Sequence, residues 1–88
     1  MIDPVKVLMA SADTIAERGA DYGGIEDNFT NISLLMARTT NRMLSPYDVA
    51  MLMACVKLAR ISQSPGKRDS YVDAINYLAF ACELIGAK

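Results

Sequence analysis

The sequence predicts a single all-α domain over residues 1–88, a small four-helix bundle-like fold. Four segments repeat apolar residues at the three- and four-residue spacing of a helix face, and short breaks rich in Gly, Pro and Ser separate them. No segment shows the sustained alternation of apolar and polar residues that a half-buried strand needs. A chain of this length buries only about 60–65% of its unfolded surface, so we expect marginal stability for the isolated domain.

The first two helices are predicted from their start signals and apolar stripes. Asp3 provides an N-cap acceptor, and Pro4 suits the first helical position because its missing N–H has no partner there anyway. Gly19 is predicted to end this helix as a C-terminal cap. The second helix is predicted from near Ile25 to about Thr39. The expected core stripes are Val5, Leu8, Ala12 and Ile15 in the first helix, and Ile25, Phe29, Ile32 and Met36 in the second.

The third helix has the clearest start signal in the chain. Ser45 is predicted to cap it, Pro46 occupies the first turn, and Asp48 completes a capping box with a shorter acid than usual. The helix is predicted to run to about Ser62. The Ser-Pro-Gly sequence at 64–66 then breaks the chain.

The fourth helix is predicted from about Asp69 to Ile85, with Gly86 ending it. The segments 49–56 and 77–82 are apolar on almost every side of their helices. A helix of this kind must be covered on every side, and four short helices do not easily surround two of their own members. We therefore expect a homodimer in which the third and fourth helices form a shared core. The alternative is a compact monomer with a large apolar patch.

Composition and charge exclude several classes of protein. Nine basic and ten acidic residues give a net charge of −1, without the basic excess of a nucleic-acid binder, so nucleic acid is not an expected partner. The longest apolar run, 49–56, is far too short to span a membrane. The chain has no His and no C-x-x-C motif, so Cys55 and Cys82 are expected to be buried free thiols. We expect a cytoplasmic protein without a secretory signal.

Charged side chains at the facing ends of the last two predicted helices are candidates for a site. Lys57 and Arg60 share one face near the end of the third helix. Asp69, Asp73 and Asn76 follow one another at spacings of four and three, so they share a face at the start of the fourth. If these faces meet, acids and bases converge in one cleft.

Two interpretations of these residues stay open. In the structural one, Glu26, Asp27 and Asp69 satisfy helix N-termini, and Asp73 pairs with Lys57 or Arg60. In the functional one, the site binds Mg²⁺ and phosphates, because hard oxygen ligands suit Mg²⁺ and cationic side chains hold phosphate groups. The candidate metal ligands are Glu26, Asp69 and Asp73, and the candidate substrate-binding residues are Tyr22, Lys57, Arg60, Arg68 and Asn76. No residue is assigned as catalytic.

Five short motifs in a fixed order resemble a small phage and prophage domain family of uncharacterised function. The resemblance covers about residues 15–85. The motifs are R-G-x-x-Y-G at 18–23, E-x-N-F at 26–29, D-V-A-x-x-M at 48–53, K-x-A-R at 57–60 and R-D-S-x-x-D at 68–73.

More distantly, the arrangement is similar to the MazG-like all-α nucleotide pyrophosphatases. That resemblance implies helical dimers or tetramers that bind Mg²⁺ through E-x-x-E and E-x-x-D motifs and cleave nucleoside triphosphates to monophosphate and pyrophosphate. Glu26 would stand at the first acidic motif and Asp73 at the end of the second. Phe29 and Ser70 stand where further acids are expected, and Asp69 is the candidate replacement on the neighbouring turn.

Two functions follow from these patterns. The first is a phage-type, MazG-like, Mg²⁺-dependent nucleoside triphosphate pyrophosphohydrolase, or a degenerate relative of one, acting in the host cytoplasm. The alternative is a non-catalytic helical module that binds a nucleotide or a host protein. A helix-turn-helix DNA-binding protein ranks last, because the break at 64–66 is longer than the tight turn of that motif.

Overall fold

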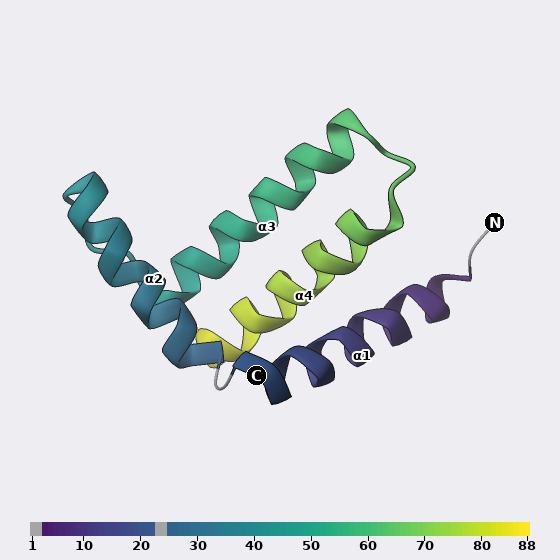
Figure 1. Ribbon diagram of the computed structural model, residues 1–88, viewed down its shortest axis with the longest axis horizontal. Helices are drawn as coiled ribbons and strands as arrows, with labels where there is room; N and C mark the ends of the chain where they lie inside the picture. Colours follow the sequence, from purple (N-terminus) through teal and green to yellow (C-terminus); the bar gives the residue numbers. More distant parts are fainter. Residues whose placement is uncertain (1–2, 23–24) are drawn as a thin grey trace.

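The protein is all-helical, as the sequence predicts. A computed structural model describes residues 3–22 and 25–88, and within these ranges it contains four α-helices and no strand. The helices are α1 (Pro4–Tyr22), α2 (Ile25–Thr40), α3 (Pro46–Gln63) and α4 (Arg68–Leu84). They are shown in Figure 1.

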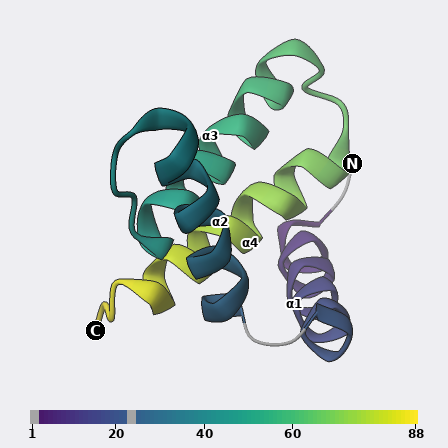
Figure 2. The ribbon, with the colours of Figure 1, turned by 60° about the vertical axis from the view of Figure 1, so that its left-hand side comes forward.

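Helices α3 and α4 form the centre of the fold. They run antiparallel to each other and share the most extensive contact in the molecule (Figure 1). Helix α1 lies along α4 and runs in the same direction, while α2 lies across the α3–α4 pair (Figure 2). The end of α3 and the start of α4 therefore lie together at the far side of the molecule from α2.

The start of α3 confirms the predicted capping box. The Ser45 hydroxyl oxygen accepts a hydrogen bond from the Asp48 N–H at 3.0 Å, and the Asp48 carboxylate accepts one from the Ser45 N–H at 2.9 Å. Pro46 occupies the first turn. Each side chain thus satisfies a backbone donor that the helix itself cannot.

Several helix ends differ from the sequence prediction by one to three residues. Gly19 does not end α1, which continues to Tyr22, because a glycine inside a helix costs only about 1 kcal/mol relative to alanine and does not by itself stop one. At the end of α2, Asn41 adopts a left-handed backbone with φ of 57°. Helix α4 begins at Arg68, one residue earlier than predicted, while Gly86, with φ of 69°, lies just beyond its end as expected.

The core is small and lies where α2 crosses α3 and α4. Phe29 from α2 is buried against Val49 and Ala50 of α3 and against Ala81 of α4. The Phe29 ring lies 6.2 Å from the Tyr77 ring and makes an edge-on contact with a second aromatic ring of α4, Phe80. The predicted stripe residue Phe29 is therefore confirmed as the main anchor of α2.

Much of the remaining apolar surface stays exposed. Cys55 and Cys82 are free thiols as predicted, but the prediction that they are buried is wrong. Both are exposed although their sequence neighbours are apolar, because an apolar context does not decide which side of a helix is covered. Among the described helices, none is both long and apolar enough to cross a bilayer.

Candidate functional site

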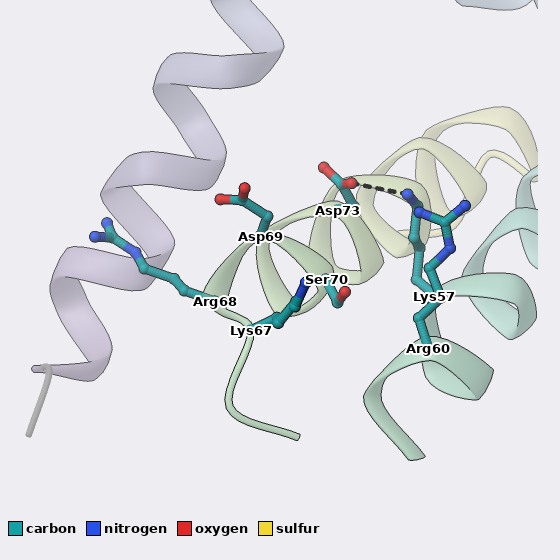
Figure 3. A pocket seen from close by; sticks show the side chains of 7 residues that line it. All are labelled: Lys57, Arg60, Lys67, Arg68, Asp69, Ser70 and Asp73. Atoms are coloured by element: carbon teal, nitrogen blue, oxygen red, sulfur yellow. Dashed lines mark ion pairs between the residues drawn. The ribbon is translucent and has the colours of Figure 1, made fainter. Parts of the chain in front are cut away.

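A cleft of about 470 Å³ opens where the last turns of α3 meet the first turns of α4 (Figure 3). The helices reach this point together because the segment that joins them, 64–67, is a short turn, shorter than the sequence analysis expects. The Tyr71 hydroxyl fixes that turn by donating a hydrogen bond to the Pro65 carbonyl at 2.9 Å. Charged side chains dominate the lining. It consists of Lys57, Arg60, Lys67, Arg68, Asp69, Ser70 and Asp73.

One ion pair crosses the cleft. The Lys57 Nζ atom lies 2.9 Å from an Asp73 carboxylate oxygen, and the two side chains are only 13% and 19% exposed. The pair joins α3 to α4 (Figure 3). This contact confirms the structural interpretation in which Asp73 pairs with Lys57. It also neutralises both charges, so neither contributes net charge to the cleft.

The remaining charges make the cleft basic. Besides the central pair, the lining holds three cations, Arg60, Lys67 and Arg68, and one anion, Asp69, so its net charge is about +2. Among the described residues, only Lys57 and Asp73 approach within ion-pair distance of each other. The three cations therefore have no described carboxylate within 4.0 Å, and all three are exposed to solvent.

The start of α4 adds to this positive potential. The N-cap residue Lys67 has an extended backbone but makes no side-chain hydrogen bond to the helix. The first N–H groups of a helix carry the positive end of its dipole, and a side-chain acceptor at the cap normally offsets part of it. Here a cation stands at the cap, although Asp69 in the first turn compensates in part.

A second, more apolar hollow of about 540 Å³ adjoins the cleft. Arg60, Lys67 and Ser70 line both spaces. On the far side of Arg60 the wall is formed by Val56 and Ala59 of α3. Gln63 and Ser64 complete this lining. A polar cleft and an apolar hollow thus share one wall.

The structure brings most of the predicted site residues together. Lys57, Arg60, Arg68, Asp69 and Asp73 all line the cleft. The faces of the third and fourth helices therefore meet at the place where the sequence analysis put the possible convergence of acids and bases. Lys67 was not predicted because it lies in the turn between α3 and α4, where no periodicity assigns it to a helix face. Gln63, at the end of α3, and Ser70, in the first turn of α4, are uncharged and were not selected as site residues.

Asn76 lies elsewhere. Its side chain is buried between α1 and α4, where its Oδ1 atom accepts a hydrogen bond from the Ser11 hydroxyl at 2.6 Å. Ser11 is also 3.2 Å from the Val72 carbonyl. In this position Asn76 ties two helices together and does not line the cleft. The predictions for Tyr22 and Glu26 fall on side chains outside the part of the chain that the structure describes.

The described residues do not form a complete metal site. Within them, no three acidic, histidine or cysteine side chains come close enough together to hold a cation. Asp69 and Asp73 are the two carboxylates at the cleft, and the Asp73 carboxylate already forms an ion pair with Lys57. Mg²⁺ would therefore need oxygen ligands from a bound phosphate in addition to these side chains.

Comparison with known proteins gives a family match and one phage relative. A family model described as "Domain of unknown function (DUF6378)" matches residues 6–85. The "Gene 55 protein" of Mycobacterium phage D29 is 38% identical over 61 residues, which cover 69% of this chain and 40% of the relative. The matched segment thus spans well under half of the relative's length. No solved structure matches.

Proposed function

Because this chain belongs to the DUF6378 family, whose function is unknown, we propose a function from its site: it is a non-catalytic module that binds a nucleotide at the junction of α3 and α4. The phosphates would lie in the basic cleft and the base in the adjoining apolar hollow. The single observation that carries this proposal is the wall that the two spaces share, with Arg60 and Lys67 reaching both.

The charge arrangement supports phosphate as the ligand group. Arg60 presents a planar guanidinium group suited to phosphate oxygens, and Lys67 adds a cation at the positive end of α4. Arg68, whose side chain extends toward α1 (Figure 3), adds positive potential at the same helix end. The pairing of Lys57 with Asp73 neutralises a partly buried carboxylate that would otherwise repel an anion from the cleft. None of the three exposed cations has an ion-pair partner among the described residues, so an anion that enters breaks no described ion pair.

The apolar hollow supports a base as the second group. Val56 and Ala59 offer an apolar surface beside Arg60, whose guanidinium plane can stack on an aromatic ring. Gln63 offers an amide that can donate and accept hydrogen bonds at a base edge. A free inorganic phosphate would leave this hollow empty, so the proposal predicts tighter binding of nucleotides than of pyrophosphate.

A Mg²⁺-dependent pyrophosphohydrolase of the MazG-like kind, acting in the cytoplasm of an infected host, is the second candidate. The observation that favours it is the presence of Asp69 and Asp73 on one rim of the same cleft. A metal ion there would have to compete with Lys57 for Asp73. We rank it below simple binding for that reason.

A thermal-shift experiment separates these functions. The chain is heated with ribo- and deoxynucleoside triphosphates, with pyrophosphate, and with Mg²⁺ or chelator. A nucleotide at a hundred times its dissociation constant should stabilise the fold by about 2.7 kcal/mol. Arg60→Gln should weaken this binding at least tenfold, about 1.4 kcal/mol, because it removes a charged contact. The matched control is Arg38→Gln, an arginine in the last turn of α2 that does not line the cleft.

Each outcome assigns the site. Stabilisation without pyrophosphate release, lost in Arg60→Gln and kept in Arg38→Gln, supports the binding module. Pyrophosphate release that requires Mg²⁺ and disappears in a folded Asp73→Ala variant supports the second candidate instead. If no nucleotide shifts the melting temperature, the nucleotide proposal is wrong, and a host protein becomes the partner to seek.

A further inference from the structure

The chain exposes more surface than a compact monomer of its mass should. Its accessible surface is 6438 Å², whereas a folded monomer of 9.6 kDa is expected to expose about 5,100 Å². Its radius of gyration is 13.9 Å, against about 12 Å for a compact domain of this length. The excess of roughly 1,300 Å² exceeds the ~800 Å² that each partner buries in a standard protein–protein interface.

Part of this surface is an apolar stripe along the outer side of α4. Its residues recur at spacings of four, three, four and three, which is the heptad spacing of helices that pair along a seam. Three of the large side chains are 39%, 47% and 58% exposed in the single chain. The stripe consists of Tyr71, Ile75, Leu78, Cys82 and Ile85, and the first, third and last of these have the quoted exposures.

Helix α1 extends the same apolar face. Its outer side carries Val5 and Leu8, both more than half exposed. The contact between Ser11 of α1 and Asn76 of α4 marks the sides on which the two helices meet. Viewed from the N-terminal ends, at about 100° per residue, the α4 stripe lies counter-clockwise of Asn76, and Leu8 lies clockwise of Ser11. Because α1 and α4 run in the same direction (Figure 1), the two stripes point to the same side of the molecule.

We propose that this α1–α4 face binds a second copy of the same chain. From Tyr71 to Ile85 the stripe contains no charged residue, so nothing on it selects a charged partner. It is also symmetric about Leu78: in an antiparallel pair, Tyr71 lies opposite Ile85 of the second copy and Leu78 lies opposite itself. Such self-matching is what a two-fold interface requires.

This interface differs from the one that the sequence predicts. The sequence analysis places the third and fourth helices together in a shared core. In the structure, α3 covers one side of α4 and α1 covers another, and the stripe lies on the side of α4 that neither helix covers. The second copy would therefore meet α1 and α4, and the basic cleft at the end of α3 would remain open to solvent.

The test is the mass of the protein in solution. Sedimentation equilibrium of the whole chain at micromolar concentration should give roughly 19 kDa, twice the 9.6 kDa of one chain. Leu78→Glu should weaken association at least thirtyfold, because it places a charge at the centre of the interface. The matched control is Leu35→Glu, a leucine of α2 that is 56% exposed and lies outside this face.

Circular dichroism first establishes that each variant is helical. Should Leu78→Glu fail to fold, Leu78→Cys in a chain whose two native cysteines are serine takes its place. Oxidation should then cross-link the two copies at the two-fold axis, whereas Leu35→Cys in the same background should stay single. A wild-type mass of one chain, a folded Leu78→Glu that still dimerises, or dissociation by Leu35→Glu would each overturn the proposal.

Discussion

The N-termini of α3 and α4 begin alike in sequence and differ in chemistry. Both follow a Ser-Pro pair, at Ser45-Pro46 and at Ser64-Pro65. After the first pair, Asp48 closes the capping box and the helix begins at once. After the second, Lys67 stands at the equivalent third position, and the helix begins only at Arg68 with no side-chain cap. The two helices thus differ in where they start relative to the Ser-Pro pair and in the charge near their positive ends, with Asp48 at α3 and Lys67 at α4.

The start of α3 is stabilised by its own side chains, whereas the start of α4 is left available to a ligand. At α3 the backbone donors are satisfied by the chain itself, and the Ser45 cap alone contributes about 1 kcal/mol. At α4 the corresponding stabilisation is missing, and Lys67 and Arg68 add positive charge to donors that an anion could use. The uncapped start of α4 is therefore the helix end at which a ligand should be sought.

The largest expected effect is at the contact that holds the start of α4 to α3. Asp73→Ala leaves the Lys57 ammonium mostly buried without its partner, so we expect a loss of about 3 kcal/mol in the free energy of unfolding. Urea denaturation followed by circular dichroism measures it. The double variant Lys57→Met with Asp73→Leu should recover most of the loss, and a double variant as unstable as the single one would contradict this explanation.

A smaller loss is expected at the capped end. Ser45→Ala removes the side-chain acceptor for the Asp48 N–H, and stability should fall by about 1 kcal/mol while nucleotide affinity stays unchanged. Thermal melts with and without nucleotide measure both quantities on the same sample. A change in affinity would show that the two helix ends are not independent.

The smallest effect is expected when a cap is given to the other end. Lys67 has φ of −92° and ψ of 107°, an extended conformation that a capping residue can adopt. Lys67→Asp should therefore gain a cap and raise stability by roughly 0.5–1 kcal/mol, while nucleotide affinity falls because a cation becomes an anion. A neutral control, Lys67→Ser, should gain a similar cap with a smaller loss of affinity. Equal losses in both variants would contradict a charge-based role.

The sequence predicted the helices better than their surroundings. Local signals, such as the capping box at Ser45 and the glycine at Gly86, act within a few residues and were confirmed. Gly19 was misread because a glycine weakens a helix without obliging it to end. The exposure of Cys82 was misread because an apolar helix does not say which of its sides has a neighbour. Only the packing of helices decides that.

The candidate site was predicted in its helical parts and missed in its turn. Spacing put Lys57 and Asp73 on helix faces that would converge if the two helices met there, and the structure joins them. Asn76 shares their spacing, yet it lies at the contact with α1, because each side of α4 has a different neighbour. Lys67 was missed because residues of a turn have no periodicity from which a direction can be inferred.

The small residues between α3 and α4 also determine how wide the cleft can be. Ala50 and Ala54 of α3 and Ala74 and Ala81 of α4 are almost completely buried. Their small side chains allow α3 and α4 to lie close together, and the ion pair between Lys57 and Asp73 requires this closeness. A larger side chain at one of these alanines would push α3 and α4 apart. A substitution more than one turn from the cleft would then change the width of the cleft without contacting it. Along the contact between α3 and α4, substitutions should therefore be tolerated least at the buried alanines.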